Sequence, residues 1–140
     1  MKFVLSTCFF FSLTVALFAQ NQKVELRQLH QSNTVYFYEE KPYTGIVYEK
    51  HENGNIGLWG ELKNGKREGV WTYWYSSGTK KRETTYVNNQ KEGNTYYWHE
   101  NGILAKTITF RANQNIDQKL WDITGTRLKN PQFLIVNYKL

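Results

Sequence analysis

Glycine recurs at a fixed interval through the middle of the chain. Two sets of three glycines, each with a spacing of 24 residues, are Gly45, Gly69 and Gly93, and Gly54, Gly78 and Gly102. A chain that repeats one supersecondary unit builds its core by stacking neighbouring units. The interval therefore predicts repeats at residues 45–68, 69–92 and 93–116, with degenerate end units at 23–44 and 117–140.

Each repeat divides into two extended runs separated by turn signals. Asn53-Gly54 is a dipeptide that accepts positive φ at both central positions of a tight hairpin turn, and the same place is taken by Ser77-Gly78 and Asn101-Gly102. A second turn-prone stretch falls at residues 63–66 and again at 87–90. Strand, turn, strand, turn is the predicted order within a repeat.

Alternation along the second run of each repeat favours strands over helices. The residues expected on one face are Ile56, Leu58, Gly60 and Leu62, then Thr84 and Tyr86, then Leu104, Ile108 and Phe110. The sequence predicts an all-β fold, an elongated antiparallel meander of stacked β-hairpin repeats with about four to five 24-residue units.

The two ends of the repeat region follow the pattern less closely. Residues 24–38 are expected to form a first hairpin in the same register, with its turn at 31–33. Residues 121–128 resemble a fourth copy in which the spacing has slipped by one, and 133–138 are expected to form a closing strand. Atypical end units are common in repeat arrays because one side faces water.

The first 19 residues have the pattern of a secretory signal peptide. Lys2 is followed by an apolar run at 3–18 and by Ala19 before a polar switch, so cleavage is expected after Ala19. An uncleaved anchor is the alternative, but the run is shorter than the ~20 apolar residues that cross a bilayer. Cys8 lies too early in the run for a lipidation signal. We expect export to the periplasm, outer envelope or exterior, with 20–140 as one repeat domain.

Cleavage would change the chemistry available to the exported chain. It removes Cys8, the only cysteine, and with it disulfides, thiolate metal sites and cysteine nucleophiles. It also removes Lys2, which lowers the formal net charge from +6 to +5. This modest excess suits an acidic partner or an anionic surface, and equally suits solubility alone.

Four short stretches resemble the MORN-type repeat in its bacterial variant, which is found in the YwqK-like antitoxin family. Residues 43–45, 52–54, 65–71 and 99–102 read YTG, ENG, GKREGVW and HENG. The resemblance covers roughly residues 34–128. It implies an elongated single-layer antiparallel sheet of successive hairpins that serves as a scaffold, and it admits an antitoxin function.

Aromatic residues form the candidate binding site. The residues expected to line one face are Trp71, Tyr73, Tyr75, Tyr97 and His99. Cross-strand packing is one explanation, because rings on strands ~4.8 Å apart touch and stiffen a sheet. The other is a platform for an extended peptide, a glycan or a lipid headgroup, with a protein partner placed first.

No residue pattern in the sequence points to an enzyme, a metal site or a cofactor. His51 and His99 share a column but are four strands apart, roughly 19 Å, too far to share a metal ion. Glu68 and Glu92 precede repeat glycines, which suits hairpin ends better than an acid and base pair. No nucleophile elbow or phosphate-binding loop is present in the sequence.

A basic run at residues 80–82 is accompanied by Lys63, Lys66, Arg67 and Lys106. The commoner role for such residues is a solvated strand edge that resists aggregation. Contact with an anionic membrane is the alternative, and nucleic acid is not expected for an exported protein. The favoured function is a non-enzymatic protein-binding scaffold at the cell envelope or outside it, with lipid-headgroup or glycan binding and an antitoxin role as alternatives.

Overall fold

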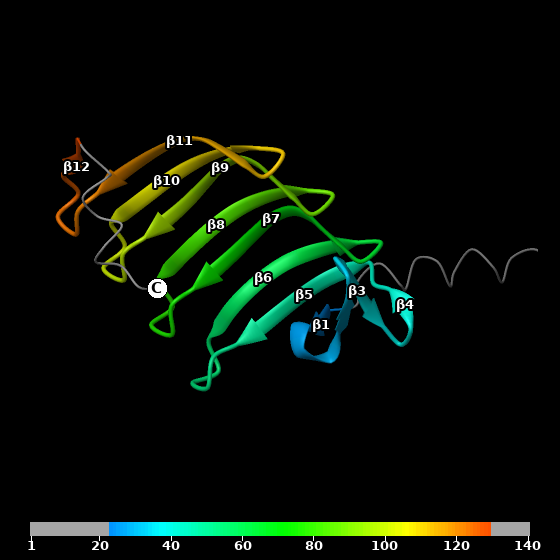
Figure 1. Cartoon of the computed structure of the whole chain (residues 1–140). Coiled ribbons are helices and arrows are strands. Elements are labelled where there is room, and N and C mark those ends of the chain that lie inside the picture. Colours follow the sequence, from blue (N-terminus) through cyan, green and yellow to red (C-terminus); the bar gives the residue numbers. More distant parts are fainter. Residues whose placement is uncertain (1–22, 130–140) are drawn as a thin grey trace, which may run out of the picture.

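The computed structural model describes residues 23–129, which form an almost entirely β fold (Figure 1). Nine strands make one open sheet in the order β1-β5-β6-β7-β8-β9-β10-β11-β12, in which every pair except β1 with β5 is antiparallel. Successive hairpins build this sheet from β5 onward, which confirms the predicted fold class. The expected signal peptide at 1–19 and the expected closing strand at 133–138 lie outside the described residues.

The strands of the large sheet have the following bounds: β1 Lys23–Glu25, β5 Gly45–Lys50, β6 Ile56–Lys63, β7 Lys66–Trp74, β8 Lys80–Val87, β9 Gln90–Trp98, β10 Leu104–Arg111, β11 Gln114–Trp121 and β12 Arg127–Leu128. A second sheet contains β2 (His30–Ser32), β3 (Val35–Tyr38) and β4 (Lys41–Pro42), and the 3₁₀ helix η2 spans Leu26–Gln28. In the described part of the chain, no helix is long and apolar enough to cross a membrane.

One end of the hairpins carries the same turn four times. In the first, the Gly54 N–H donates to His51 O at 2.9 Å and the His51 N–H donates to Asn55 O at 2.8 Å. The same pair of bonds recurs around Gly78, Gly102 and Gly125. Only the glycine has positive φ, between 85° and 89° in the four turns. The expectation of positive φ at both central positions is therefore wrong for this end.

The residue before the turn glycine is held by its own side chain. Asn53 Oδ1 accepts from the Asn55 N–H at 3.1 Å, as Asn101 Oδ1 does from Ile103 N–H. Such a bond two residues onward favours a longer turn in which glycine alone enters the left-handed region. The two-residue turns with positive φ at both positions lie at the other end of the hairpins, at 64–65, 88–89 and 112–113, where a turn was predicted for the first two.

Bulges in β7 and β9 contribute to the repeat length of 24 residues. At one place in its pairing with β6, strand β7 contains two extra residues, and β9 does the same in its pairing with β8. Gly69 and Gly93 lie in these bulges with φ of 66° and 70°. In β11 the corresponding bulge holds a single extra residue, Ile116. This shorter bulge explains why the last turn glycine, Gly125, follows Gly102 by one residue fewer than the other intervals.

The N-terminal segment does not continue the meander. Strand β1 pairs in parallel with β5, and the hairpin of β2 and β3 belongs to the second sheet, with its turn at residues 33–34. The expected first hairpin in the register of the repeats is therefore wrong. The segment instead folds back onto the large sheet, where the Tyr36 N–H donates to Gly65 O at 2.8 Å. Packing a second layer buries apolar surface that a single sheet would leave in water.

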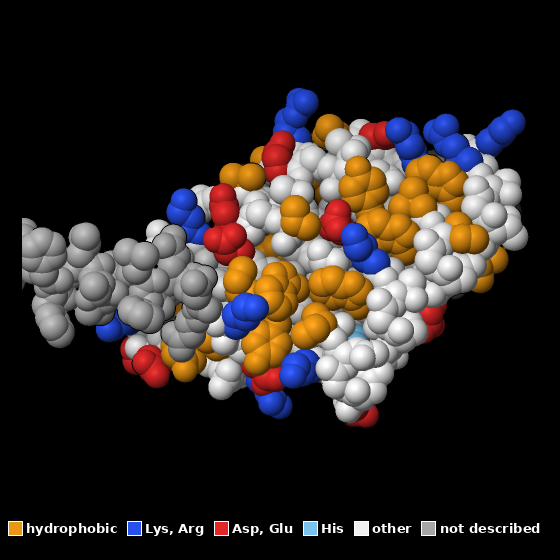
Figure 2. Space-filling model, turned by 180° about the vertical axis from the view of Figure 1, so that it is seen from behind, with side chains coloured by type: hydrophobic (Ala, Val, Ile, Leu, Met, Phe, Trp, Pro, Cys, Tyr) orange, Lys and Arg blue, Asp and Glu red, His pale blue; other side chains and the backbone are white. Residues whose placement is uncertain are grey.

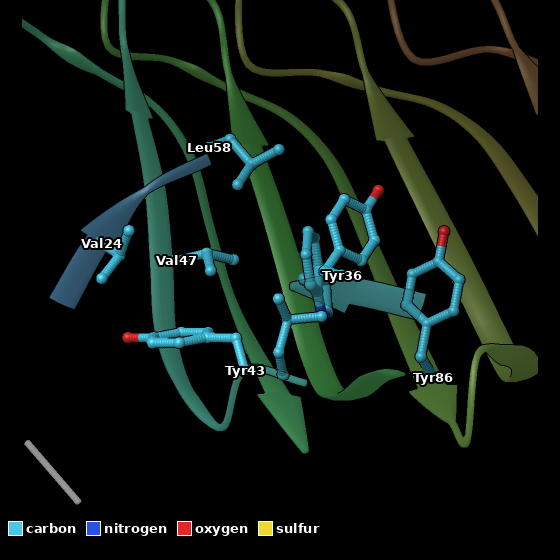
Figure 3. Packing of buried hydrophobic residues seen from close by; sticks show 8 residues of the cluster. Val24, Tyr36, Tyr43, Val47, Leu58 and Tyr86 are labelled. Atoms are coloured by element: carbon cyan, nitrogen blue, oxygen red, sulfur yellow. The ribbon is translucent and has the colours of Figure 1, made fainter. Parts of the chain in front are cut away.

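We call η2 and the second sheet, residues 26–42, the N-terminal layer. The core lies between this N-terminal layer and the first half of the large sheet (Figure 3). Its buried residues are Val24, Tyr36, Tyr43, Val47, Leu58, Leu62, Trp71 and Tyr86. Trp71 has no exposed surface, and its indole Nε1–H donates to Glu61 O at 3.1 Å. We call the sheet face on which this layer packs the inner face, and the opposite one the outer face. The predicted alternation is confirmed for Leu62, Tyr86 and Phe110, which are all buried. It is wrong for Ile56 and Leu104, because a one-residue bulge pairs them with Lys50 and Trp98 of the outer face.

Gly60 leaves the space that Trp71 occupies. A Cβ atom at residue 60 would lie 2.3 Å from Trp71 Cδ2. We therefore expect Gly60→Ala to lower the free energy of unfolding by about 1–3 kcal/mol, because the indole must shift within a packed core. Chemical denaturation measures this loss. Thr85→Val on the outer face is the control, because it keeps a β-branched side chain in the strand, and its expected change is within about 0.5 kcal/mol. An equally small change for Gly60→Ala would contradict the packing described.

Candidate functional site

Two rows of aromatic and cationic side chains cross the inner face. The first row contains Tyr73, Arg82, Tyr97 and Lys106, which lie directly opposite one another in β7, β8, β9 and β10. Arg82 Cζ lies 3.8 Å from the centroid of the Tyr73 ring, and Lys106 Nζ lies 4.6 Å from that of Tyr97. Each cation thus covers a ring of the neighbouring strand, a favourable arrangement for both groups.

The second row lies nearer the two-residue turns and contains Arg67, Tyr86, Lys91 and Phe110. Arg67 Cζ lies 5.3 Å from the Tyr86 ring centroid and Lys91 Nζ lies 4.8 Å from that of Phe110. Arg67 also donates to the Tyr36 hydroxyl at 2.9 Å, which ties the row to the N-terminal layer. Cations and rings therefore alternate in both rows, but in the opposite order: β7 and β9 supply the rings of the first row and the cations of the second.

Small residues separate the two rows. Thr84 and Thr95 lie opposite one another in β8 and β9 and are each only 1% exposed. The side chains of Arg82, Tyr97 and Lys106 on one side are partly exposed, as is that of Lys91 on the other. A ligand on this part of the face meets rings and cations before it meets the threonines.

The cations of the two rows have no carboxylate partner among residues 23–129. The ion pairs in that range join Arg27 to Glu25, Lys80 to Glu83 and Lys119 to Asp117. The Nε atoms of Arg67 and Arg82 are buried without a hydrogen-bond acceptor. The positive charge of the face is therefore not neutralised within the described protein.

Burial and the neighbouring charges shift the pKa values of the lysines and of Tyr73. Burial lowers the pKa of Lys91, and the charges of Arg82 and Arg67 lower it further. Burial also lowers the pKa of Lys106, with the charge of Lys91 adding to the effect. Burial raises the pKa of the Tyr73 hydroxyl, although the charge of Arg82 acts in the opposite direction. The lysines are thus repelled by neighbouring cations, and an anion bound close to them would relieve this repulsion.

The structure divides the five residues predicted to form the binding face. Tyr73 and Tyr97 lie in the first row, where both rings are partly exposed. Trp71 is completely buried, so its predicted place on a binding surface is wrong. Sequence alternation put it on the same face as Tyr73, but that face is a core at β7 because the N-terminal layer covers it.

Tyr75 and His99 belong to a hydrogen-bonded ladder between turns. The Tyr75 hydroxyl donates to Trp98 O at 2.9 Å, and His99 Nε2 lies 3.2 Å from Trp121 O. His51 Nε2 makes the equivalent contact with Trp74 O at 3.0 Å. These three residues share one column of the repeat and join each turn to the next, which gives them a structural role.

Two carboxylates that were predicted at hairpin ends also join neighbouring repeats, at the end of the strands with the two-residue turns. Glu68 Oε2 accepts from the Asn88 N–H at 2.8 Å, and Glu92 Oε2 accepts from the Ala112 N–H at 2.9 Å. Each carboxylate therefore caps the two-residue turn of the next repeat, as expected for hairpin ends. Within residues 23–129 no group of three or more His, Cys, Asp and Glu residues is placed to hold a metal ion.

The sequence reasoning missed the cationic half of the site. It treated the basic residues as one solvated strand edge, but β7, β8 and β10 are internal strands. Arg82 and Lys106 lie on the inner face, whereas Lys63 and Lys66 face outward opposite each other. Strand alternation could have predicted the position of Arg82. It lies two and four residues before Thr84 and Tyr86, both of which were expected on the inner face.

The outer face is also rich in rings, but its charges are mixed. Tyr96 and Trp98 pack at 5.9 Å between ring centroids, and Lys80 Nζ lies 5.1 Å from the Trp98 ring. Lys80 also pairs with Glu83 at 2.7 Å. Figure 2, which views the molecule from behind, shows hydrophobic side chains in groups with acidic and basic residues among them.

Comparison with known proteins finds no family model that matches the chain, no similar curated protein and no similar solved structure. The resemblance to MORN-type repeats and to the YwqK-like family therefore stays a prediction from the sequence.

The turn ladder predicts different effects for two similar tyrosines. Tyr75→Phe removes the bond to Trp98 O, so we expect the free energy of unfolding to fall by about 1 kcal/mol. Tyr97→Phe is the matched control, because the Tyr97 hydroxyl makes no hydrogen bond within residues 23–129, and its expected change is within about 0.5 kcal/mol. Urea denaturation of both variants measures the difference. Equal losses would contradict the structural role of Tyr75.

Crowding of the lysines predicts a pH-dependent stability difference. The Lys91→Met/Lys106→Met variant keeps the apolar stems and loses both charges. The folded protein binds the two protons less tightly than the unfolded chain, whose lysines have the ordinary pKa of 10.5. The stability of the wild type relative to the variant should therefore rise as the pH increases from the lowered pKa values to 10.5.

Burial makes the largest contribution to this rise, and repulsion from the neighbouring charges adds to it. Denaturation at a series of pH values measures it, and the tyrosines titrate in both proteins and cancel in the difference. A difference that stays constant between neutral pH and pH 10.5 would show that folding does not lower the pKa of either lysine.

Proposed function

We propose that the protein is a non-enzymatic scaffold that binds another protein through the uncovered part of its inner sheet face. The observation that carries this proposal is that the two rows of aromatic and cationic side chains continue from β8 to β10, past the strands that the N-terminal layer covers. That layer packs mainly on β5 to β7, whereas within residues 23–129 the extensive contacts of β9 and β10 are with their neighbours in the sheet. The remaining inner face keeps its rings and cations partly in water.

The composition of this uncovered surface suits protein recognition. Tyrosine and arginine are enriched where proteins meet, because they combine a large contact area with hydrogen-bonding groups. Tyr97 and Arg82 lie next to each other at the middle of the surface. The strands under them are internal and each is paired on both sides, so the surface is held rigid before a partner arrives.

The ring faces favour a protein over a glycan or a nucleic acid. Sugars and bases bind aromatic residues by stacking on a free ring face. Here Arg82 covers Tyr73 and Lys106 covers Tyr97. Stacking would require the cations to move away from rings that attract them. Contacts to the edges of the rings and to the cations need no such displacement.

The place of action in this proposal is the cell envelope or the exterior. Its support is the signal-peptide pattern of residues 1–19, which has a basic start, an apolar run and a small residue before a polar switch.

Site-specific photocrosslinking tests the proposed binding face. A photoreactive phenylalanine analogue replaces Tyr97 on the inner face or, as the matched control, the adjacent Tyr96 on the outer face of the same strand. In the cells that produce the protein, we expect a discrete covalent adduct with one protein from residue 97 and none from residue 96. Adducts of equal yield from both sites, or none from residue 97, would refute the proposal.

A further inference from the structure

We propose that the partner segment held on the uncovered inner face is acidic, and that Arg82, Lys91 and Lys106 bind its carboxylates. This inference rests on the proposed function and names the chemistry of the partner. An extended acidic peptide lying across β8, β9 and β10 is the occupant that the charges of the surface fit.

Charge is segregated between the two faces of the sheet. From β7 to β10 the inner face carries Arg67, Arg82, Lys91 and Lys106 and no acidic residue, as the pairing register shows. The carboxylates of the same strands, Glu68, Glu83 and Glu92, have the opposite parity. Mixed charge of both signs is the usual state of a solvated surface, so an unmixed face indicates an anionic partner.

The carboxylates of these strands already have other partners. Glu68 and Glu92 cap the turns at 88–89 and 112–113, and Glu83 is paired with Lys80. None of these carboxylates is free to reach across the sheet to Arg82 or Lys91. The inner cations must therefore find their counter-charge outside the described fold.

The cations are near enough to act together. Arg82 and Lys106 are two strands apart, which is about 10 Å, and the two rows are four residues apart along β8, which is about 13 Å. An extended peptide of about four residues spans β8, β9 and β10 and points alternate side chains toward opposite rows. Acidic side chains at successive positions of such a peptide would reach Lys91 on one side and Arg82 or Lys106 on the other.

A defined peptide tests this inference in solution. A fluorescently labelled peptide of twelve glutamates is titrated with the mature protein, and a peptide of twelve glutamines is the uncharged control. We expect saturable binding of the glutamate peptide that weakens as salt is raised, and no binding of the glutamine peptide. Absence of saturable binding to the glutamate peptide at low salt would overturn the inference.

Matched charge variants locate the contact. The triple variant Arg82→Gln/Lys91→Gln/Lys106→Gln loses three inner cations, and Lys50→Gln/Lys63→Gln/Lys66→Gln loses three cations from the turn ends and outer face. We expect the inner variant to bind the glutamate peptide at least about tenfold more weakly and the outer variant to lose less than about threefold. Equal losses would show binding to net charge alone and would overturn the inference.

A second measurement stands even if the triple variant folds poorly. Side-chain NMR of the wild type reports the pKa values of Lys91 and Lys106, which burial and neighbouring charge lower. Bound carboxylates should raise both values toward that of ordinary lysine. Unchanged pKa values in the saturated complex would place the peptide elsewhere.

The outcomes separate this inference from the proposed function. A discrete adduct at residue 97 together with no glutamate-peptide binding would leave the protein partner in place and remove its acidic character. Binding of vesicles that contain phosphatidylglycerol, lost in the inner variant while the glutamate peptide does not bind, would identify an anionic membrane as the occupant and would overturn the acidic peptide.

Discussion

The fold depends most on the packing of Trp71 over Gly60. The indole is completely buried, and the missing side chain of Gly60 provides the room for it beside the N-terminal layer. Trp71 also meets Tyr86 edge to face at 6.1 Å between ring centroids, so this one ring of β7 contacts both neighbouring strands and links the covered part of the sheet to the uncovered part. Because the core contains few buried residues, a displaced indole would loosen both layers.

Beyond β8 the sheet has no second layer in the described residues, and repeated short-range contacts replace a core. Each turn is hydrogen-bonded to the next at both ends of the strands, through the column of His51, Tyr75 and His99 and through carboxylates such as Glu68. Asn89 adds a further link, since its N–H donates to Arg67 O at 2.9 Å and its Oδ1 accepts from Arg67 N–H at 2.7 Å. Each repeat in this part of the sheet is therefore stabilised by the repeats next to it, as in other repeat proteins.

Regular spacing made the meander predictable, whereas the N-terminal layer was not. Glycine columns and alternating apolar residues report local geometry, and they located the strands, the turns and the inner face. They carry no information on whether a segment such as β3 continues the sheet or folds back over it, because both arrangements need the same alternation. For the same reason Trp71 and Tyr73 were indistinguishable in the sequence, although only the first is covered completely.

The candidate site was half predictable for a related reason. Rings are easily recognised as a surface, but the cations between them acquire meaning only from the pairing register, which places Arg82 between Tyr73 and Tyr97. Before the register is known, basic residues on neighbouring strands resemble a general solvated surface. Once it is known, Lys106 extends the row by one strand, and its sign matches that of Arg82 with no acid between them.

Arg67 connects the two halves of the molecule and sets the boundary of the site. Its guanidinium lies among Tyr36, Trp71 and Tyr86, so it is held by the N-terminal layer as well as by the sheet. A cation fixed in this way contributes positive potential to the surface but is poorly placed to close around a ligand. Burial lowers the pKa of Lys91, and the charges of Arg82 and Arg67 lower it further, so Lys91 lies within that potential. Under the proposal of an acidic partner, Arg67 contributes a fixed positive charge at the edge of the site, and Arg82, Lys91 and Lys106 contact the anion from β8, β9 and β10.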